Sequence, residues 1–132
     1  MKNEVIYTNS EKMRQIKLNS LSDGATFLVE IDGKSISNLE QYLAQISNLF
    51  KFPMPSRSLN SYCDWMRDLE WLEVEGYALV IYNFKNLFID EPPMKETILE
   101  DFKELILPWW QEEVERCVVG GKAKSFNVYL VD

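Results

Sequence analysis

An unbroken apolar run at residues 77–82, Tyr-Ala-Leu-Val-Ile-Tyr, limits the fold of this chain more than any other feature. Gly76 and Asn83 bound the run, and its length suits a β-strand. Because no polar residues alternate with the apolar ones, both faces of such a strand must be covered. Helices that connect parallel strands supply this cover. The run therefore predicts the central strand of a parallel sheet in an α/β fold.

Two other segments have the composition of strands, with helical patterns between them. Residues 25–31 are rich in β-formers and stop at an Asp-Gly turn, and residues 126–131, Phe-Asn-Val-Tyr-Leu-Val, are a last run of strand-forming residues. Helical crossovers between successive strands imply that the strands are parallel. We expect a three-stranded, mostly parallel sheet packed with helices in a single compact α/β domain.

Two helices are predicted between the first strand and the central one. Apolar residues recur at spacings of three and four over residues 38–50, and Ser37 and Glu40 match a capping box at the start of that helix. The same spacing continues from Ser58, a predicted N-cap, to about Leu69. The second of these helices follows directly on a loop that contains two prolines.

Two parts of the chain are open to more than one interpretation. Residues 94–119 are predicted as one long helix or as two joined helices, because Pro108 must kink a helix or begin a new one. Residues 1–24 are polar and irregular, and they form either an arm or an extra edge element of the sheet. We therefore divide the chain into an N-terminal arm of uncertain structure, residues 1–24, and an α/β domain, residues 25–132.

The composition excludes several classes of function. Lys and Arg number 14 against 21 for Asp and Glu, and the net charge of −7 is the opposite of the basic footprint that binds nucleic-acid phosphates. The chain has no histidine, which excludes Ser-His-Asp and Cys-His catalysis. Its five glycines match neither a Walker A nor a G-x-G-x-x-G spacing. We expect a binding protein rather than an enzyme, with no cofactor and no nucleic-acid partner.

The sequence also gives no sign of a metal site or a membrane segment. Cys63 and Cys117 are far apart, whereas a structural zinc site needs four closely spaced ligands, so we interpret both as reduced thiols that serve as small apolar residues. No stretch approaches 18 apolar residues, and the N-terminus has no apolar signal-peptide core. We expect no metal site, no membrane partner and a cytoplasmic location.

The second predicted helix has an unusual polar flank. Asn60, Asp64 and Asp68 stack at positions i, i+4 and i+8, outside the apolar stripe of the helix. Trp65 projects beside them and has no obvious place in the core. The flank is either a solvated helix face or an interface in which an aromatic anchor lies among steering charges.

Several short sequences occur in an order known from one protein family. They are Phe-Leu-Val-Glu-Ile-Asp-Gly at residues 27–33, Ser-Ile-Ser-Asn-Leu at 35–39, Phe-Pro at 52–53, Ser-Leu-Asn-Ser-Tyr-Cys-Asp-Trp-Met-Arg-Asp-Leu at 58–69 and Phe-x-Val-x-Leu at 126–130. With the apolar central strand, this order resembles the barstar family over about residues 25–132. Barstar-like proteins are intracellular inhibitors of secreted microbial ribonucleases of the barnase type, which the resemblance implies for this chain.

The resemblance also implies which residues contact the partner. In that family the second helix and the loop before it enter the nuclease active site, where carboxylates replace RNA phosphates. Asp64 falls at an interfacial aspartate of the family pattern, whereas Asn60 stands where the pattern has a second aspartate. Met-Pro-Ser-Arg at residues 54–57 replaces the expected tyrosine pair and glycine, and Trp71 lies roughly at a family aromatic position. A further acidic contact comes from Asp90, Glu91 or Glu96.

From these arguments we predict an immunity protein that binds a basic secreted ribonuclease or a toxin nuclease domain and occludes its active site. The alternatives are a barstar-fold interaction or regulatory module with a non-nuclease partner, anchored by Trp65 and Met54, and a small carboxylate-dependent hydrolase. The predicted partner-binding residues are Phe52, Met54, Arg57, Asn60, Ser61, Asp64, Trp65, Asp68 and Trp71.

Overall fold

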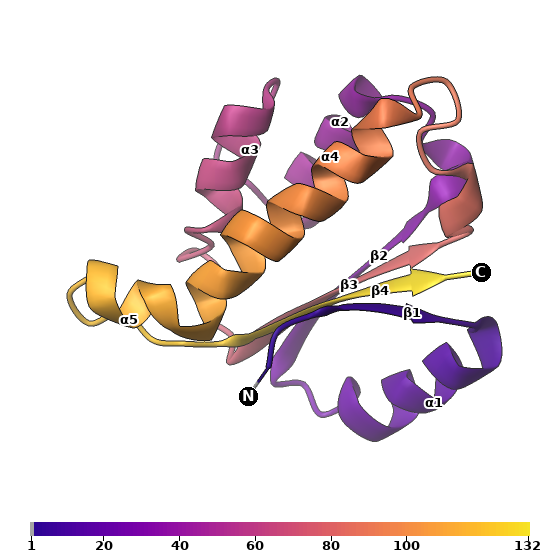
Figure 1. Ribbon diagram of the computed structural model, residues 1–132. Coiled ribbons are helices and arrows are strands. Elements are labelled where there is room, and N and C mark those ends of the chain that lie inside the picture. The colour runs from indigo at the N-terminus through magenta and orange to yellow at the C-terminus, as the bar shows by residue number, and fades with distance from the viewer. Residues whose placement is uncertain (1) are drawn as a thin grey trace.

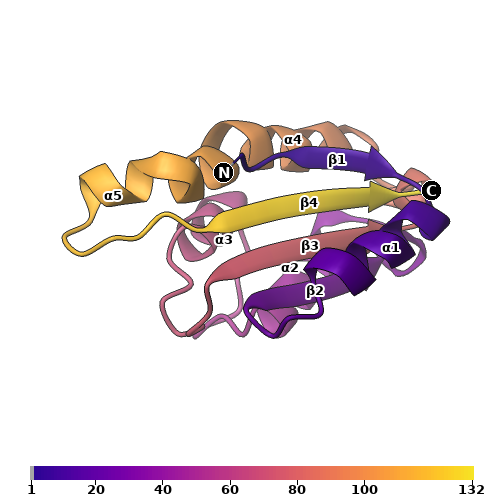
Figure 2. The same cartoon turned by 90° about the horizontal axis from the view of Figure 1, so that it is seen from below.

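The computed structural model describes residues 2–132, which form a four-stranded parallel sheet with helices on both faces (Figures 1 and 2). The strands are arranged in the order β1-β4-β3-β2, which Figure 2 shows from below. Their bounds are β1 Val5–Thr8, β2 Thr26–Asp32, β3 Gly76–Tyr82 and β4 Ser125–Val131. The predicted α/β class and the three predicted strands are confirmed.

Strand β3 occupies the centre of the sheet, as its apolar run predicts. Every residue from Gly76 to Ile81 is buried, and Leu79 pairs with Val29 of β2 on one side and with Val128 of β4 on the other. A Cβ at Gly76 would crowd the Ser125 hydroxyl and lie 3.2 Å from the Ser125 carbonyl oxygen, so glycine suits this close approach of β3 and β4. Both faces of β3 are covered by helices.

The sheet has one strand more than the sequence predicts, because Val5–Thr8 adds β1 at the free edge of β4. The backbone N–H of Glu4 donates to the Asn127 side chain at 3.0 Å, and the Val128 N–H donates to the Glu4 carbonyl at 3.1 Å. The buried Asn3 side chain holds this end of the strand, since it accepts from the Phe126 N–H at 3.0 Å. The signal for β1 is only four residues long within a polar segment, which explains why the sequence leaves it undecided.

Helix α1 lies on one face of the sheet, and the other helices lie on the opposite face (Figure 1). From β1 to β2 the chain crosses the whole sheet in one direction, and from β2 through β3 to β4 it returns. Because crossovers between parallel strands are right-handed, the reversal places α1 on the opposite face. The helices are α1 Ser10–Ser20, α2 Leu39–Leu49, α3 Leu59–Met66, α4 Pro93–Asp101 and α5 Val114–Cys117.

The chain between α4 and α5 is also helical, so residues 93–117 form one long helix without a break at Pro108. Two π-helical segments, Phe102–Ile106 and Trp109–Glu113, lie on either side of the proline. The Leu107 N–H donates to the Phe102 carbonyl, five residues earlier, in place of the usual bond to the fourth residue. The wider π turns accommodate a residue that has no N–H and would clash with the preceding turn.

The caps of the two middle helices agree with the sequence in one case and differ in the other. Ser58 caps α3 as predicted, since its Oγ atom accepts from the Ser61 N–H at 3.2 Å. At α2 the N-cap lies one residue later than predicted: Asn38 accepts from the Gln41 N–H at 2.9 Å, and the Gln41 side chain accepts at 2.6 Å from the N–H of Ser37, the residue before the N-cap. Ser37 and Glu40 therefore do not form the box. Either pair has the residue types for it, and the sequence alone does not choose the register.

Within residues 2–132, no helix has both the length and the apolar character needed to cross a bilayer.

A buried pair of tyrosines joins α2 to α3. The hydroxyl groups of Tyr42 and Tyr62 are 2.7 Å apart, and both side chains are fully buried with their rings in edge contact. Each hydroxyl satisfies the other in a region that water does not reach. The pair fixes the distance between α2 and α3 at the centre of the helical layer.

We predict that Tyr62→Phe lowers the free energy of unfolding by about 1–3 kcal/mol, because the substitution leaves the Tyr42 hydroxyl buried without a partner. The double variant Tyr42→Phe/Tyr62→Phe should lose less than the sum of the two single variants, since no unpaired hydroxyl remains. Urea unfolding followed by fluorescence measures both values. Tyr7→Phe, at an exposed tyrosine, is the control, and an equal loss for Tyr7→Phe and Tyr62→Phe would contradict the prediction.

Candidate protein-binding site

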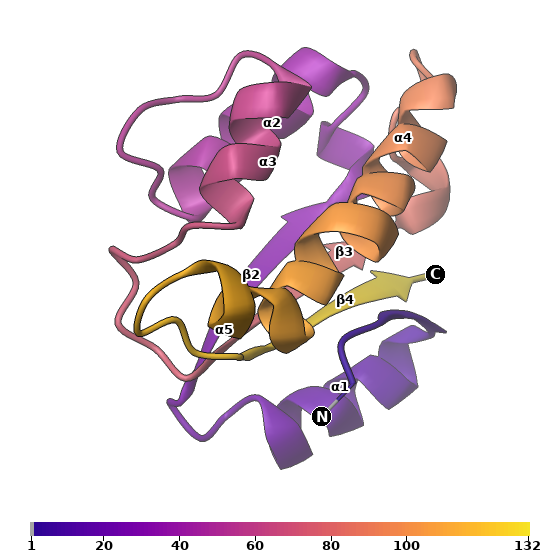
Figure 3. The same cartoon turned by 60° about the vertical axis from the view of Figure 1, so that its left-hand side comes forward.

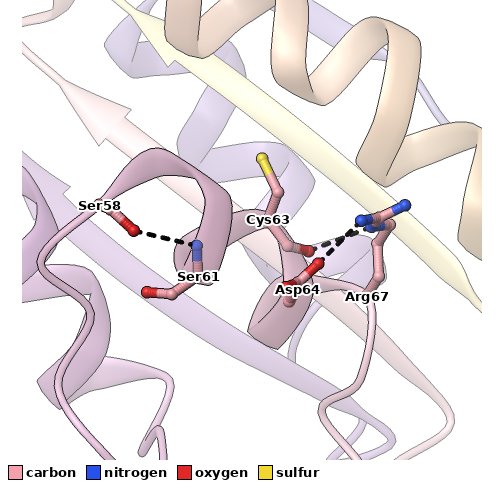
Figure 4. Close-up of polar contacts among 5 residues, drawn as sticks. All are labelled: Ser58, Ser61, Cys63, Asp64 and Arg67. Atoms are coloured by element: carbon pink, nitrogen blue, oxygen red, sulfur yellow. Dashed lines mark hydrogen bonds and ion pairs between the residues drawn. The ribbon is translucent and has the colours of Figure 1, made fainter.

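The loop before α3 is held in place by a chain of serine hydrogen bonds. The backbone N–H of buried Ser56 donates to the Ser47 Oγ atom at 2.9 Å, and the hydroxyls of Ser56 and Ser61 are 2.7 Å apart. Two residues after Ser56, Ser58 is the N-cap of α3 (Figure 4). The loop is thus tied to α2 on one side and to the first turn of α3 on the other. Predicted site residue Ser61 has this structural role, which the sequence does not reveal.

Asp64 projects from the middle of α3 into solvent. Its side chain is 75% exposed, and one carboxylate oxygen lies 3.1 Å from the Arg67 guanidinium (Figure 4). Arg67 also donates from its Nε atom to the Cys63 carbonyl at 3.2 Å, which holds the guanidinium against the end of the helix. An exposed ion pair of this kind contributes at most about 1 kcal/mol to stability, so the carboxylate can exchange this partner for another cation at little cost.

Of the predicted polar flank, only Asn60 and Asp64 lie on one face of a helix. Helix α3 ends at Met66, three residues earlier than the predicted end, and Leu69 follows in a left-handed conformation with φ of 50°. Asp68 therefore lies in the turn after the helix, where its carboxylate accepts from the Glu70 N–H at 3.3 Å. The expected i+8 position of Asp68 is wrong, because the chain must turn early to bury Leu69.

The aromatic residues of the site belong to one packed cluster, and the prediction that Trp65 lacks a core position is wrong. The Trp65 ring lies 5.5 Å from the Trp71 ring and 6.3 Å from the Phe52 ring. Trp71 donates from its Nε1 atom to the Phe50 carbonyl at 2.9 Å. These side chains join the loop, the end of α3 and the following turn. They support the site from below, and Trp65 is half-buried instead of projecting freely.

Two of the predicted partner-binding residues lie exposed on the loop, and no hydrogen bond or ion pair ties either side chain to the described chain. Met54 is 67% exposed, and Arg57 is exposed at the end of the loop. Beside them a hollow of about 650 Å³ lies between α2 and the loop, with Leu39, Leu43 and Pro55 in its walls. Met54 is therefore the one aromatic or large apolar residue of the predicted set that presents most of its surface to a partner.

The structure separates the three acidic candidates near the start of the long helix. Glu91 is engaged with the protein itself, because its carboxylate accepts from the Leu39 N–H at 2.8 Å at the start of α2. Asp90 and Glu96 are exposed. Glu91 thus stabilises a helix N-terminus, where a carboxylate is favoured, and Asp90 and Glu96 remain available to a partner.

Beneath α3 lies a polar group that the sequence analysis missed. The Asp101 Oδ2 atom of α4 is buried and has no hydrogen-bond partner within the described chain. Burial raises the pKa of Asp101 above its ordinary value of 3.8, and this effect outweighs the interaction with the Cys63 thiol, which lowers it. Burial likewise raises the pKa of Cys63 to about 12, so this thiol stays protonated. In the sequence, Asp101 directly precedes Phe102 and looks like any acidic residue on an amphipathic helix, so its burial could not be predicted.

The two cysteines differ in their surroundings. Cys63 is a buried free thiol, as predicted, whereas Cys117 is free and exposed at the end of α5. The interpretation of Cys117 as a core residue is therefore wrong, because the long helix leaves the body of the protein before it reaches that residue. Among residues 2–132, no three Cys, Asp or Glu side chains are grouped so that they could hold a metal ion.

An exposed carboxylate on a short, rigidly capped helix beside a fixed loop defines a surface that suits protein binding. Comparison with known families matches the Barstar family, described as barstar (barnase inhibitor), over residues 26–120. This chain belongs to the barstar family. The predicted resemblance is confirmed, and the family is one of inhibitors, not of enzymes, with a ribonuclease as the partner. Comparisons with curated proteins and with solved structures gave no match.

We predict unequal stability effects for substitutions at the two neighbouring residues Asp64 and Trp65. Trp65→Ala should lower the free energy of unfolding by about 2–3 kcal/mol, somewhat less than for a fully buried tryptophan, because it leaves a gap against Phe52 and Trp71. Asp64→Ala should change this energy by less than about 1 kcal/mol, because it removes only an exposed ion pair. Chemical denaturation of both variants measures the difference. A fully stable Trp65→Ala variant would show that the aromatic cluster does not support the site.

We predict that Asp101→Asn stabilises the protein at pH 7 and alters its pH dependence. Because the folded-state pKa of Asp101 is raised, the folded protein binds this proton more tightly than the unfolded chain does. Stability from this group is therefore present at low pH and falls as pH rises from about 4 through the folded-state pKa. Thermal melts between pH 4 and 8 should show a flatter profile for Asp101→Asn than for the wild type. Glu104→Gln, on the exposed side of the long helix, should leave the profile unchanged.

Proposed function

We propose that this protein is an immunity protein that inhibits a basic ribonuclease by covering its active site with α3 and the loop at residues 52–57. The observation that carries the proposal is the exposed carboxylate of Asp64, held on a helix whose start and end are both fixed, in a chain of the barstar family. Preorganisation matters because a rigid surface loses little conformational entropy when it binds.

The charge distribution supports a basic partner. Residues 60–75 contain five acidic residues and one arginine, and the whole chain has a net charge of −7. A nuclease that binds the phosphates of RNA presents cationic groups in its active site. An acidic surface attracts such a partner over distances of about 10 Å at moderate salt and speeds association.

The proposed mechanism is direct occupation of the phosphate-binding site. On binding, the Asp64 carboxylate exchanges Arg67 for cationic groups of the nuclease and takes the place of an RNA phosphate. Asn60, one turn earlier on the same face, offers a neutral acceptor and donor beside it. Met54 on the loop supplies an apolar contact at the edge of the acidic surface. The ribonuclease then has no room for RNA, and no chemical step by the inhibitor is needed.

The proposal also assigns a role to each part of the chain. We place inhibition in residues 25–132, with β1 and α1 completing the sheet beneath the site. The partner is a secreted ribonuclease or a toxin nuclease domain, and the inhibitor acts in the cytoplasm of the cell that makes it. The alternative of an interaction module anchored by Trp65 has less support, because Trp65 packs against Phe52 and Trp71. The hydrolase alternative has no group of residues to support it.

We predict that Asp64→Ala weakens inhibition of barnase by about 2 kcal/mol or more, roughly 30-fold in Kd, because the variant loses the central carboxylate of the interface. Stopped-flow association at several salt concentrations should also show a smaller salt dependence than the wild type. Glu11→Ala is the matched control, since Glu11 is an exposed acidic residue on α1, on the opposite face of the sheet. Equal Kd values for the wild type and Asp64→Ala would remove Asp64 from the site, and the absence of any inhibition by the wild type would contradict the proposed function.

A further inference from the structure

The long helix ends in an exposed apolar turn. Cys117, Val118 and Val119 follow one another there, with Val118 45% exposed and Val119 fully exposed. Two glycines complete the turn, and we call residues 117–121 the apolar tip. Single exposed apolar residues are common on proteins, whereas adjoining ones form a patch that marks an interaction surface.

The backbone of the apolar tip is fixed by its own hydrogen bonds. The Val118 N–H donates to the Val114 carbonyl at 3.1 Å, and the Gly121 N–H donates to the Val118 carbonyl at 2.9 Å. Gly120 has a φ of 76°, and a Cβ at Gly121 would lie 2.4 Å from the Val114 carbonyl oxygen. Both positions therefore require glycine. The backbone that carries Val118 and Val119 is therefore held in a defined turn.

The apolar tip adjoins the C-terminal end of α3, which carries Asp64. Trp110 of the long helix donates from its Nε1 atom to the Met66 carbonyl at 2.8 Å, and the Arg67 guanidinium lies 6.0 Å from the centre of the Trp109 ring. A hollow of about 400 Å³ is lined by Arg67 and Asp68 on one side and by Val118 on the other. In Figures 1 and 3, α5 lies beside the segment that follows α3. The proposed inhibitory surface thus continues from α3 to the apolar tip.

Charged residues of both signs surround the apolar tip. Three acidic residues, Glu112, Glu113 and Glu115, precede it in the last turns of the helix, and three basic residues, Arg116, Lys122 and Lys124, lie beside it. An apolar centre with charged residues at its rim is the usual arrangement of a protein interface.

The usual size of a protein interface also indicates that surface beyond α3 and its loop takes part in binding. A standard protein interface takes roughly 20–30 residues from each partner. The loop at residues 52–57 and helix α3 together contain fewer than that, and part of them is buried. Adjoining surface must therefore take part in the binding of a whole ribonuclease.

We propose that the apolar tip is a second contact of the ribonuclease, in which Val118 and Val119 pack against an apolar patch beside the nuclease active site. This inference rests on the proposed function and adds a division of roles to it. Asp64 and its neighbours speed association through charge, and the apolar tip slows dissociation through buried apolar surface.

The double variant Val118→Ser/Val119→Ser tests the inference with barnase as the probe. We expect the dissociation rate to rise and the Kd to increase about tenfold, because two apolar side chains lose their burial in the complex. The salt dependence of association should stay that of the wild type, in contrast to Asp64→Ala. Leu18→Ser, at a leucine 63% exposed on α1, is the matched control and should bind like the wild type. Because the valines are exposed, both variants should melt at the wild-type temperature.

The outcomes separate the two proposals. If Asp64→Ala weakens binding while Val118→Ser/Val119→Ser binds like the wild type, the apolar tip lies outside the interface and the proposed function stands. If the wild type does not bind barnase, the proposed function is overturned for ribonucleases of the barnase type, and the inference about the apolar tip is overturned with it. If the valine substitutions abolish a dimer of this chain and leave barnase binding unchanged, the apolar tip contacts a second copy, and the inference is overturned.

Discussion

The complete burial of strand β3 is the constraint on which the rest of the structure depends. A strand that is apolar on both faces needs a layer of helices above and below it, and the long crossovers of a parallel sheet supply the upper layer. Helix α1 supplies the lower one, where Met13 packs against Val80 and Tyr129. Residues 5–20, which form β1 and α1, are therefore part of the fold, and β1 also covers the edge that β4 would otherwise leave unpaired.

The same buried layer determines where the proposed site lies. Helix α3 is short, so its position comes from contacts with its neighbours and not from its own stability. The Tyr42–Tyr62 pair ties it to α2, and Trp110 ties its last turn to the long helix. Its buried side chains point into the core, which leaves Asp64 on the outer face. A carboxylate in one fixed place is what an inhibitor needs when it has to match the phosphate site of an enzyme.

Much of this fold could be predicted from the sequence, because strands β2, β3 and β4 and helices α2 and α3 carry local patterns of burial. The features that the sequence missed depend on contacts between distant residues. Strand β1 is too short to recognise without β4 beside it, and Trp65 finds its place only when Phe52 and Trp71 are brought together. Glu91 looks like an available acid until α2 places Leu39 next to it. In the site, the helix and the loop were predicted, but the separation of supporting residues from exposed ones was not.

Which residues of the site are exposed determines how a partner can be recognised. Long-range charge attracts any basic protein, so the acidic surface around Asp64 gives speed and little selectivity. Selectivity requires surfaces that fit one partner and exclude others. In this chain, the loop with exposed Met54 precedes α3, and the turn at exposed Val118 and Val119 adjoins the residues that follow α3. Asn60 gives the helix one negative charge fewer than a second aspartate would, and under the proposed function more of the recognition then rests on those two surfaces.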